Sequence, residues 1–90
     1  MKIAVIGAGS WGTALATSFG RSSEVNLYST NDELVLRLQQ ARENQRYLPG
    51  VELPDSVQIT DSLVDALDGA SGIVIAVPTR GLRSIIKACQ

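Results

Sequence analysis

Short apolar runs and stretches of helical periodicity alternate along this chain. The runs "KIAVI" and "GIVIAV" are continuous, as expected of parallel strands that are buried on both faces. In "EVNLYS" the apolar residues Val25 and Leu27 share one face, and "SVQIT" is a further short run of the same kind. The pattern predicts four strands, at residues 2–6, 24–29, 56–60 and 72–77.

The intervening residues have apolar positions three and four apart, which is typical of one face of a helix. The first helix is predicted to begin at Ser10 and to end at Gly20, acting as a C-terminal cap. A short helix is predicted at 61–67, whereas two prolines and a glycine in 47–55 predict an irregular connection. The expected apolar faces are Trp11, Ala14, Leu15, Ser18 and Phe19 in the first helix, Leu34, Val35, Leu38 and Ala41 in the second, and Leu82, Ile85, Ile86 and Cys89 in the last.

Strands and helices in alternation favour the α/β class, with a parallel sheet covered by helices on both faces. Ninety residues suffice for one small domain. The last helical pattern carries no stop signal, so we interpret 1–90 as a truncated N-terminal domain of a longer protein.

Charge and cysteine content narrow the function classes. Eight basic and nine acidic residues give a net charge of −1 without a basic stripe, so no nucleic-acid partner is expected. The single cysteine, Cys89, precludes an intrachain disulfide and favours a reducing compartment. No apolar stretch is long enough for a signal or membrane segment, which favours a cytoplasmic protein that binds no membrane. The acids Asp61, Asp65 and Asp68 lack the spacing of a metal site, and 42–46, "RENQR", is interpreted as a solvated helix end.

The first predicted strand runs into "GAGSWG", where three glycines have the spacing of a phosphate-binding turn before a helix. Gly7 allows a sharp turn, Gly9 lets the backbone approach a pyrophosphate, and Gly12 lets the helix pack closely. The N–H groups near Ser10 and Trp11 then face the anion, which the helix dipole favours. We therefore predict a Rossmann-like dinucleotide-binding sheet, although glycine-rich turns also occur as plain tight connections.

Two features leave alternatives open. Trp11 stands either beside the phosphates and ribose or as a half-buried aromatic that closes the helix start. An acid at the end of the second strand favours NAD, and an arginine favours NADP. Here Ser29, Thr30 and Asn31 are neutral, and Asp32 suits the first turn of a helix better than a ribose contact. The sequence therefore leaves open the choice between NAD and NADP.

Three stretches together resemble one enzyme family: "KIAVIGAGSWGTALA" (2–16), "ENQRYLPGVELPDSVQITDSL" (43–63) and "IVIAVPTRGLR" (73–83). They are similar to the NAD(P)-dependent sn-glycerol-3-phosphate dehydrogenases. The glycine motif is widespread, but its combination with an Asn before "YLPG" and a strand ending in "AVPT" is specific. The resemblance implies the cofactor-binding part of an enzyme that passes hydride between NAD(P)H and dihydroxyacetone phosphate or sn-glycerol 3-phosphate, supplying glycerophospholipid synthesis.

The resemblance also implies the site residues. The family often carries a basic residue near Thr30 and Asn31, and its absence argues against a strong preference for NADP. The family's catalytic lysines and substrate contacts fall beyond residue 90, so no catalytic residue is expected here, and the substrate is bound only with the missing C-terminal domain. The expected cofactor contacts are Gly7, Gly9, Ser10, Trp11, Gly12, Thr30, Asn31, Tyr47 and, on the nicotinamide side, Pro78.

Two other functions stay open. One is the N-terminal domain of another NAD(P)-dependent reductase of similar fold, against which "YLPG" argues. The other is a stand-alone nucleotide-sensing module, against which the unfinished last helix argues. The isolated 90 residues are expected to be inactive, and the uncovered face of the last helix (Leu82, Ile85, Ile86) favours self-association as a homodimer.

Overall fold

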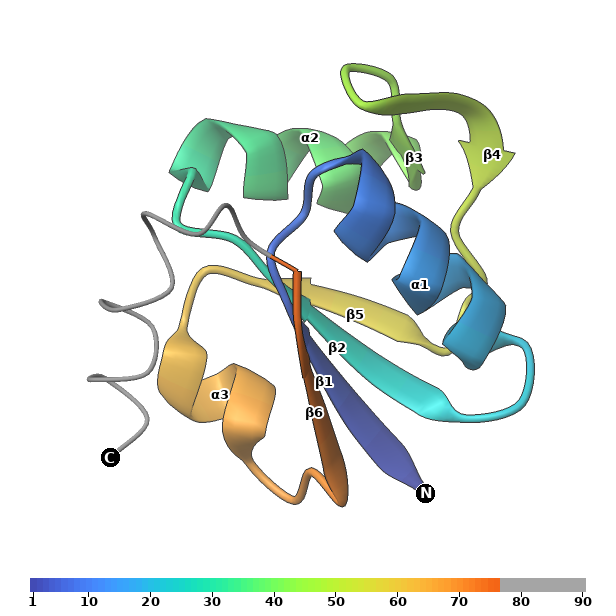
Figure 1. The fold of residues 1–90 in the computed structure, drawn as a ribbon. Coiled ribbons are helices and arrows are strands. Elements are labelled where there is room, and N and C mark those ends of the chain that lie inside the picture. Colours follow the sequence, from blue (N-terminus) through green and yellow to red (C-terminus); the bar gives the residue numbers. More distant parts are fainter. Residues whose placement is uncertain (77–90) are drawn as a thin grey trace.

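Four parallel strands form the central sheet in the computed structural model, which describes residues 1–76 (Figure 1). Their order across the sheet is β5-β2-β1-β6, so β1 has β2 on one side and β6 on the other. All three pairings are parallel, which confirms the predicted sheet. The strands span Lys2–Ile6 (β1), Glu24–Tyr28 (β2), Val57–Thr60 (β5) and Gly72–Ile75 (β6).

Helices cover both faces of this sheet (Figure 1). On one face α1 and α2 enclose the larger apolar core, to which Val5 and Leu27 contribute. On the other face α3 covers a smaller cluster around Ala4 and Ile6. Because successive strand residues point to opposite faces, the continuous run in β1 supplies both cores. The helices of the described residues span Ser10–Gly20 (α1), Asp32–Ala41 (α2) and Leu63–Leu67 (α3).

Helix α1 packs on the sheet mainly through its small residues, so the apolar face expected for it is wrong except for Phe19, which packs against the larger core. Trp11 is 68% exposed and Ser18 is also exposed, whereas Ala14, Leu15 and Phe19 are half-buried. The helix lies close to the strands, and only small side chains fit in the space between them. Its buried residues are Gly12, Thr13, Ala16, Thr17 and Gly20.

Gly20 ends α1 for a different reason from the one expected. The C-cap residue after it, Arg21, keeps a right-handed backbone with φ of −71°, so no left-handed cap forms. A β-carbon at Gly20 would lie 2.7 Å from Cγ2 of Val57 and 3.3 Å from Cγ of Pro54. Glycine is therefore needed here for the close approach of α1 to β5.

The connection after α2 is more regular than expected. Instead of an irregular segment, β3 (Glu43–Asn44) and β4 (Leu48–Glu52) pair antiparallel in a separate two-stranded sheet. The N–H of Gly50 donates to Glu43 Oε2 at 3.0 Å and fastens this small sheet. Pro49 lies within β4 and does not prevent the pairing, because a strand paired on one side only leaves half of its N–H groups outside the ladder, and Pro54 lies beyond the end of β4.

Residues 42–46 are not a solvated helix end, contrary to the expectation. Arg42 ends α2 in the left-handed conformation, with φ of 55°. Its guanidinium donates to the carbonyl oxygens of Pro54 at 2.7 Å and Val57 at 2.8 Å. These two bonds offset the cost of that conformation, which is about 1–2 kcal/mol.

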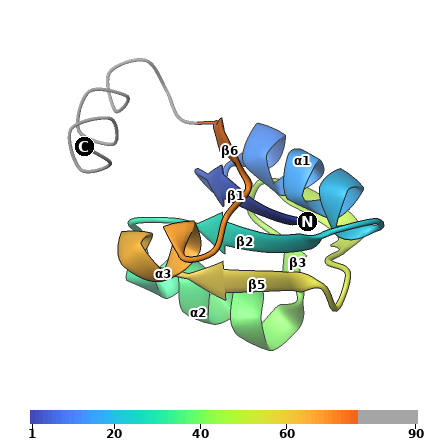
Figure 2. The ribbon, with the colours of Figure 1, turned by 90° about the horizontal axis from the view of Figure 1, so that it is seen from below.

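Strand β6 is less buried than its apolar sequence predicts. Within residues 1–76 it pairs with β1 on one side and with no strand on the other (Figure 2). Ile73 is 51% exposed and Ile75 is 39% exposed, so the expected burial on both faces is wrong for this strand. The final helix predicted around Leu82 to Cys89 lies outside the described residues. No helix found within 1–76 has the length and apolar character needed to cross a membrane.

Gly20→Ala is expected to lower the free energy of unfolding by about 1–3 kcal/mol, because the new β-carbon overlaps the Val57 methyl group. Gly72→Ala is the matched control, since a β-carbon there meets nothing within 4 Å. Urea unfolding followed by circular dichroism measures both variants. Equal stability of the two would show that α1 does not depend on this close approach.

Candidate functional site

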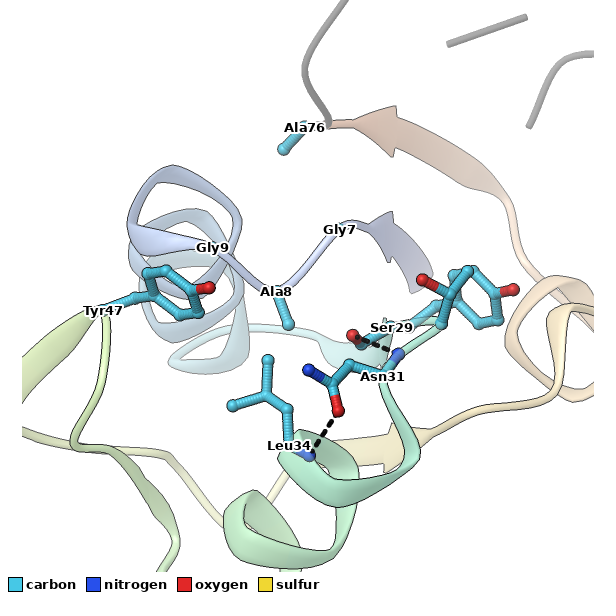
Figure 3. Close-up of a pocket in the computed structure, with 10 residues that line it drawn as sticks. Gly7, Ala8, Gly9, Ser29, Asn31, Leu34, Tyr47 and Ala76 are labelled. Atoms are coloured by element: carbon cyan, nitrogen blue, oxygen red, sulfur yellow. Dashed lines mark hydrogen bonds between the residues drawn. The ribbon is translucent and has the colours of Figure 1, made fainter. Parts of the chain in front are cut away.

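A cavity of about 300 Å³ lies at the carboxyl ends of β1, β2 and β6 (Figure 3). Chain order reverses on the two sides of β1, since β2 and β5 lie to one side and β6 to the other. Ligands of open parallel sheets bind at this kind of position, beyond the carboxyl ends of the strands. The lining residues are Gly7, Ala8, Gly9, Tyr28, Ser29, Thr30, Asn31, Leu34, Tyr47 and Ala76.

The glycine turn forms one wall of the cavity. Gly7 has a left-handed φ of 116°, and its N–H donates to the Tyr28 carbonyl at 2.9 Å. Gly12 lies behind the turn, where a β-carbon would be 1.8 Å from the Gly7 carbonyl oxygen. At Gly9, in contrast, a β-carbon would meet nothing within 4 Å, and φ of −75° suits any residue. The fold needs glycine at the first and third positions, whereas the second leaves open space beside the cavity.

Helix α1 begins at this turn without a capping side chain and without an acid in its first turn. The other two helices are capped: Asn31 Oδ1 accepts from the Leu34 N–H at 3.1 Å in α2, and Ser62 Oγ accepts from the Asp65 N–H at 3.2 Å in α3. Both also carry acids in the first turn. Since free N–H groups at a helix start attract negative charge, the start of α1 is suited to an external anion such as a phosphate.

The residues after β2 are held by short-range hydrogen bonds. Ser29 Oγ accepts from the N–H of Asn31 at 3.1 Å, and Asn31 in turn caps α2. Asp32 is the first residue of α2, which confirms its assignment to the first turn of a helix. Thr30 and Asn31 are exposed and line the cavity, so this wall is polar and neutral.

One buried side chain connects the two-stranded sheet to the glycine turn. Asn44 is 1% exposed, and its amide nitrogen donates to the Ala8 carbonyl and to Thr13 Oγ1, both at 2.8 Å. Its amide oxygen accepts from the Tyr47 N–H at 3.2 Å. The Thr13 hydroxyl also donates to the Ala8 carbonyl, at 3.4 Å. Asn44 therefore fixes Tyr47, which lines the cavity, relative to the turn and to α1.

Comparison with known proteins agrees with this geometry. The family model described as "NAD-dependent glycerol-3-phosphate dehydrogenase N-terminus" matches residues 2–90. This chain belongs to that family.

Individual relatives carry the same name. The chain is 49% identical over 87 residues to a glycerol-3-phosphate dehydrogenase (NAD(P)+) of Chlorobium phaeobacteroides, covering 96% of this chain and 26% of the relative. It is 45% identical over 92 residues to that of Geobacillus kaustophilus, covering 98% of this chain and 27% of the relative. The chain thus spans about a quarter of the length of the curated relatives it matches.

Solved structures show the same fold. The crystal structure of glycerol-3-phosphate dehydrogenase (gpsA) from Coxiella burnetii superposes with a TM-score of 0.93 at 36% identity, covering 97% of this chain and 27% of that one. The yeast enzyme GPD1 superposes with a TM-score of 0.88 at 26% identity, covering 98% of this chain and 29% of that one. Together they confirm the Rossmann-like sheet inferred from the sequence.

The structure brings together five of the nine residues expected at the site: Gly7, Gly9, Thr30, Asn31 and Tyr47 all line the cavity. Of the remaining four, Ser10 and Trp11 form the exposed start of α1 beside the turn, Gly12 lies behind it, and Pro78 lies outside the described residues.

Sequence reasoning missed several lining residues and the role of Asn44. Ala8, Tyr28 and Ala76 could have been found from the rule that residues at the carboxyl ends of adjacent parallel strands share one edge. Asn44 carried no such signal, because its partners are 31 and 36 residues away in the chain. Only the stretch before "YLPG", noted as part of a family resemblance, pointed to it.

Asn44→Ala is expected to lower the free energy of unfolding by about 1–3 kcal/mol, because the Ala8 carbonyl loses its shorter hydrogen bond in a buried place. Gln45→Ala is the matched control, since Gln45 is the exposed next residue. Urea unfolding compares the two. A loss no larger for Asn44→Ala than for Gln45→Ala would contradict the role given to this amide.

Proposed function

We propose that these 90 residues form the N-terminal, cofactor-binding part of a glycerol-3-phosphate dehydrogenase. The observation that carries the proposal is the uncapped start of α1, which stands beside open space at Gly9 and opens on the cavity. Family membership supports it, because the family is NAD-dependent and the relatives are named for this reaction.

The pyrophosphate of NAD(P) is held by the glycine turn. The N–H groups of Ser10, Trp11 and Gly12 lie in the first turn of α1, where a diphosphate takes the place of a capping side chain. The open position at Gly9 lets the phosphate oxygens approach the backbone directly.

The adenosine ribose is held by the end of β2. Thr30 and Asn31 present neutral hydrogen-bonding groups, and the Asn31 amide nitrogen, which has no hydrogen-bond partner within residues 1–76, can donate to a ribose hydroxyl while its oxygen caps α2. Tyr47 closes the opposite side of the cavity (Figure 3). Pro78, after β6, borders the nicotinamide in this proposal.

The reaction combines these residues with groups outside the described chain. When bound, NAD(P)H would supply the hydride that, together with a proton from another group, converts dihydroxyacetone phosphate to sn-glycerol 3-phosphate. None of the ten lining residues is acidic, basic or histidine. The proposal places the catalytic lysines and the substrate contacts beyond residue 90, as the family resemblance implies. Residues 1–76 therefore bind and orient, and their chemical contribution is positioning.

In the cell, we propose, the whole enzyme works in the cytoplasm and supplies the glycerol backbone of phospholipids. A related reductase with another substrate would bind the cofactor in the same way, and so would a nucleotide sensor. The relatives' common name favours the dehydrogenase over both.

Measurement of turnover tests whether these 90 residues bind the cofactor while catalysis requires the rest of the enzyme. The isolated 90 residues are expected to show no substrate-dependent change in NAD(P)H absorbance. A chimera in which they replace the matching quarter of the Chlorobium phaeobacteroides relative is expected to reduce dihydroxyacetone phosphate. The unmodified relative serves as the control. Turnover by the isolated chain, or a folded chimera that binds NADH but reduces a different ketone, would contradict the proposal.

Gly9→Val tests the open position in the turn. A valine fits the fold but occupies the space of the pyrophosphate, so the chimera is expected to lose NADH affinity by about 100-fold, as for two charge-assisted hydrogen bonds. Gly72→Val is the control, because a β-carbon there also meets nothing within 4 Å. Fluorescence titration measures both. NADH affinity unchanged by Gly9→Val would place the pyrophosphate elsewhere.

A further inference from the structure

A second cavity adjoins the first beyond the end of β2. It has a volume of about 130 Å³ and is lined by Asn31, Glu33, Leu34, Arg37 and Arg46. Asn31 and Leu34 line both cavities, so the two are adjacent. The smaller one lies on the outer side of the residues to which the adenosine ribose is assigned.

Two guanidinium groups reach this second cavity from different elements. Arg37 comes from the middle of α2, and Arg46 from the connection between β3 and β4. Arg46 could not be placed here from the sequence, because it lies 15 residues after Asn31. The antiparallel pairing of β3 with β4 brings it back beside the start of α2.

The two arginines differ in how far their charge is already satisfied. Arg37 forms an ion pair with Glu33 at 2.6 Å, one helical turn away. Arg46 makes no ion pair within residues 1–76, and its guanidinium carbon lies 5.1 Å from the centre of the Tyr47 ring. Stacking on an aromatic ring restricts a guanidinium while leaving its N–H groups at the edge free. Arg46 is therefore the cation available to an anion entering the cavity.

The position and charge of this cavity match one chemical group. A ribose bound by Thr30 and Asn31 has its 2′ oxygen at the end of the second strand, where an arginine pairs with a 2′-phosphate in NADP-binding folds. Neutral residues occupy that place in the chain itself, but the guanidinium groups of the adjoining cavity stand next to it. A volume of several water molecules admits one phosphate group.

We propose that the cavity between Asn31, Arg37 and Arg46 binds the 2′-phosphate of NADPH, with Arg46 as its principal cation. The inference rests on the proposed function, because it takes the adenosine site as given. It changes the expectation drawn from the sequence, since the cation that reads the 2′ position comes from the segment before β4 and not from the end of β2. Glu33 opposes the phosphate by charge and by holding Arg37, so this enzyme accepts both cofactors.

Adenosine 2′,5′-bisphosphate and adenosine 5′-monophosphate isolate the effect, because they differ only in the 2′-phosphate. Their dissociation constants for the 90-residue chain are measured by NMR titration, which detects weak binding. Arg46→Gln is expected to weaken binding of the bisphosphate by about tenfold and to leave the affinity for the monophosphate unchanged. Arg46→Lys is expected to restore part of the affinity for the bisphosphate. Glu33→Gln is expected to raise the affinity for the bisphosphate and to leave the affinity for the monophosphate unchanged. Arg21→Gln, an exposed arginine just after α1, is the matched control for net charge.

The outcomes separate this inference from the proposed function. If the monophosphate binds, and the parent chain and Arg46→Gln bind the bisphosphate with equal affinity, the inference is overturned. The proposed cofactor site would be unaffected by that result. The same loss in Arg21→Gln as in Arg46→Gln would also overturn it, since general charge would then be the cause. Failure of both nucleotides to bind the folded parent chain would overturn the adenosine site and the inference with it.

Discussion

The close packing of α1 against the turn that precedes it is the constraint on which the rest of this structure depends. A β-carbon at Gly12 would lie 1.8 Å from the Gly7 carbonyl oxygen, so the helix reaches its position only with glycine there. At the other end of α1, a β-carbon at Gly20 would lie 2.7 Å from a Val57 methyl group of β5, which is also a close approach. A helix held this close points its free N–H groups along the edge where the parallel strands end. The proposed anion site is thus a product of packing, and no side chain has to build it.

The open start of α1 carries a cost that the fold tolerates. A capping side chain stabilises a helix by about 1 kcal/mol, and α2 and α3 each use one. Helix α1 has no capping side chain and no acid in its first turn. Asn44 compensates from outside the helix, because its amide ties the Ala8 carbonyl and the Thr13 hydroxyl into one buried network. These buried hydrogen bonds hold the turn in its place without a ligand, and such preorganisation reduces the entropy lost on binding.

The parts of this fold that depend on local pattern could be predicted, and those that depend on distant partners could not. Strand β1 and the turn at Gly7 follow from apolar runs and glycine spacing. The buried face of α1 was predicted wrongly, because hydrophobicity alone does not show how close the helix lies to the sheet. Small residues occupy the contact, and Trp11 is exposed. The exposure of Ile73 reflects the number of strands beside β6, which no window of sequence contains.

The candidate site divides in the same way. Gly9 and Asn31 follow from the order of the elements, whereas Arg46 joins the site only through the antiparallel pairing of β3 and β4. Proline and glycine in that segment indicated a loop, but Pro49 and Gly50 lie within the paired strand β4.

Backbone amide shifts of the 90-residue chain during titration with ADP-ribose test the central claim most directly, because this ligand carries the pyrophosphate without the nicotinamide. The account predicts that the largest shifts occur at the N–H groups of Gly9 through Gly12, with smaller ones at Thr30 and Asn31. Shifts confined to other parts of the described chain, with the start of α1 unchanged, would contradict it.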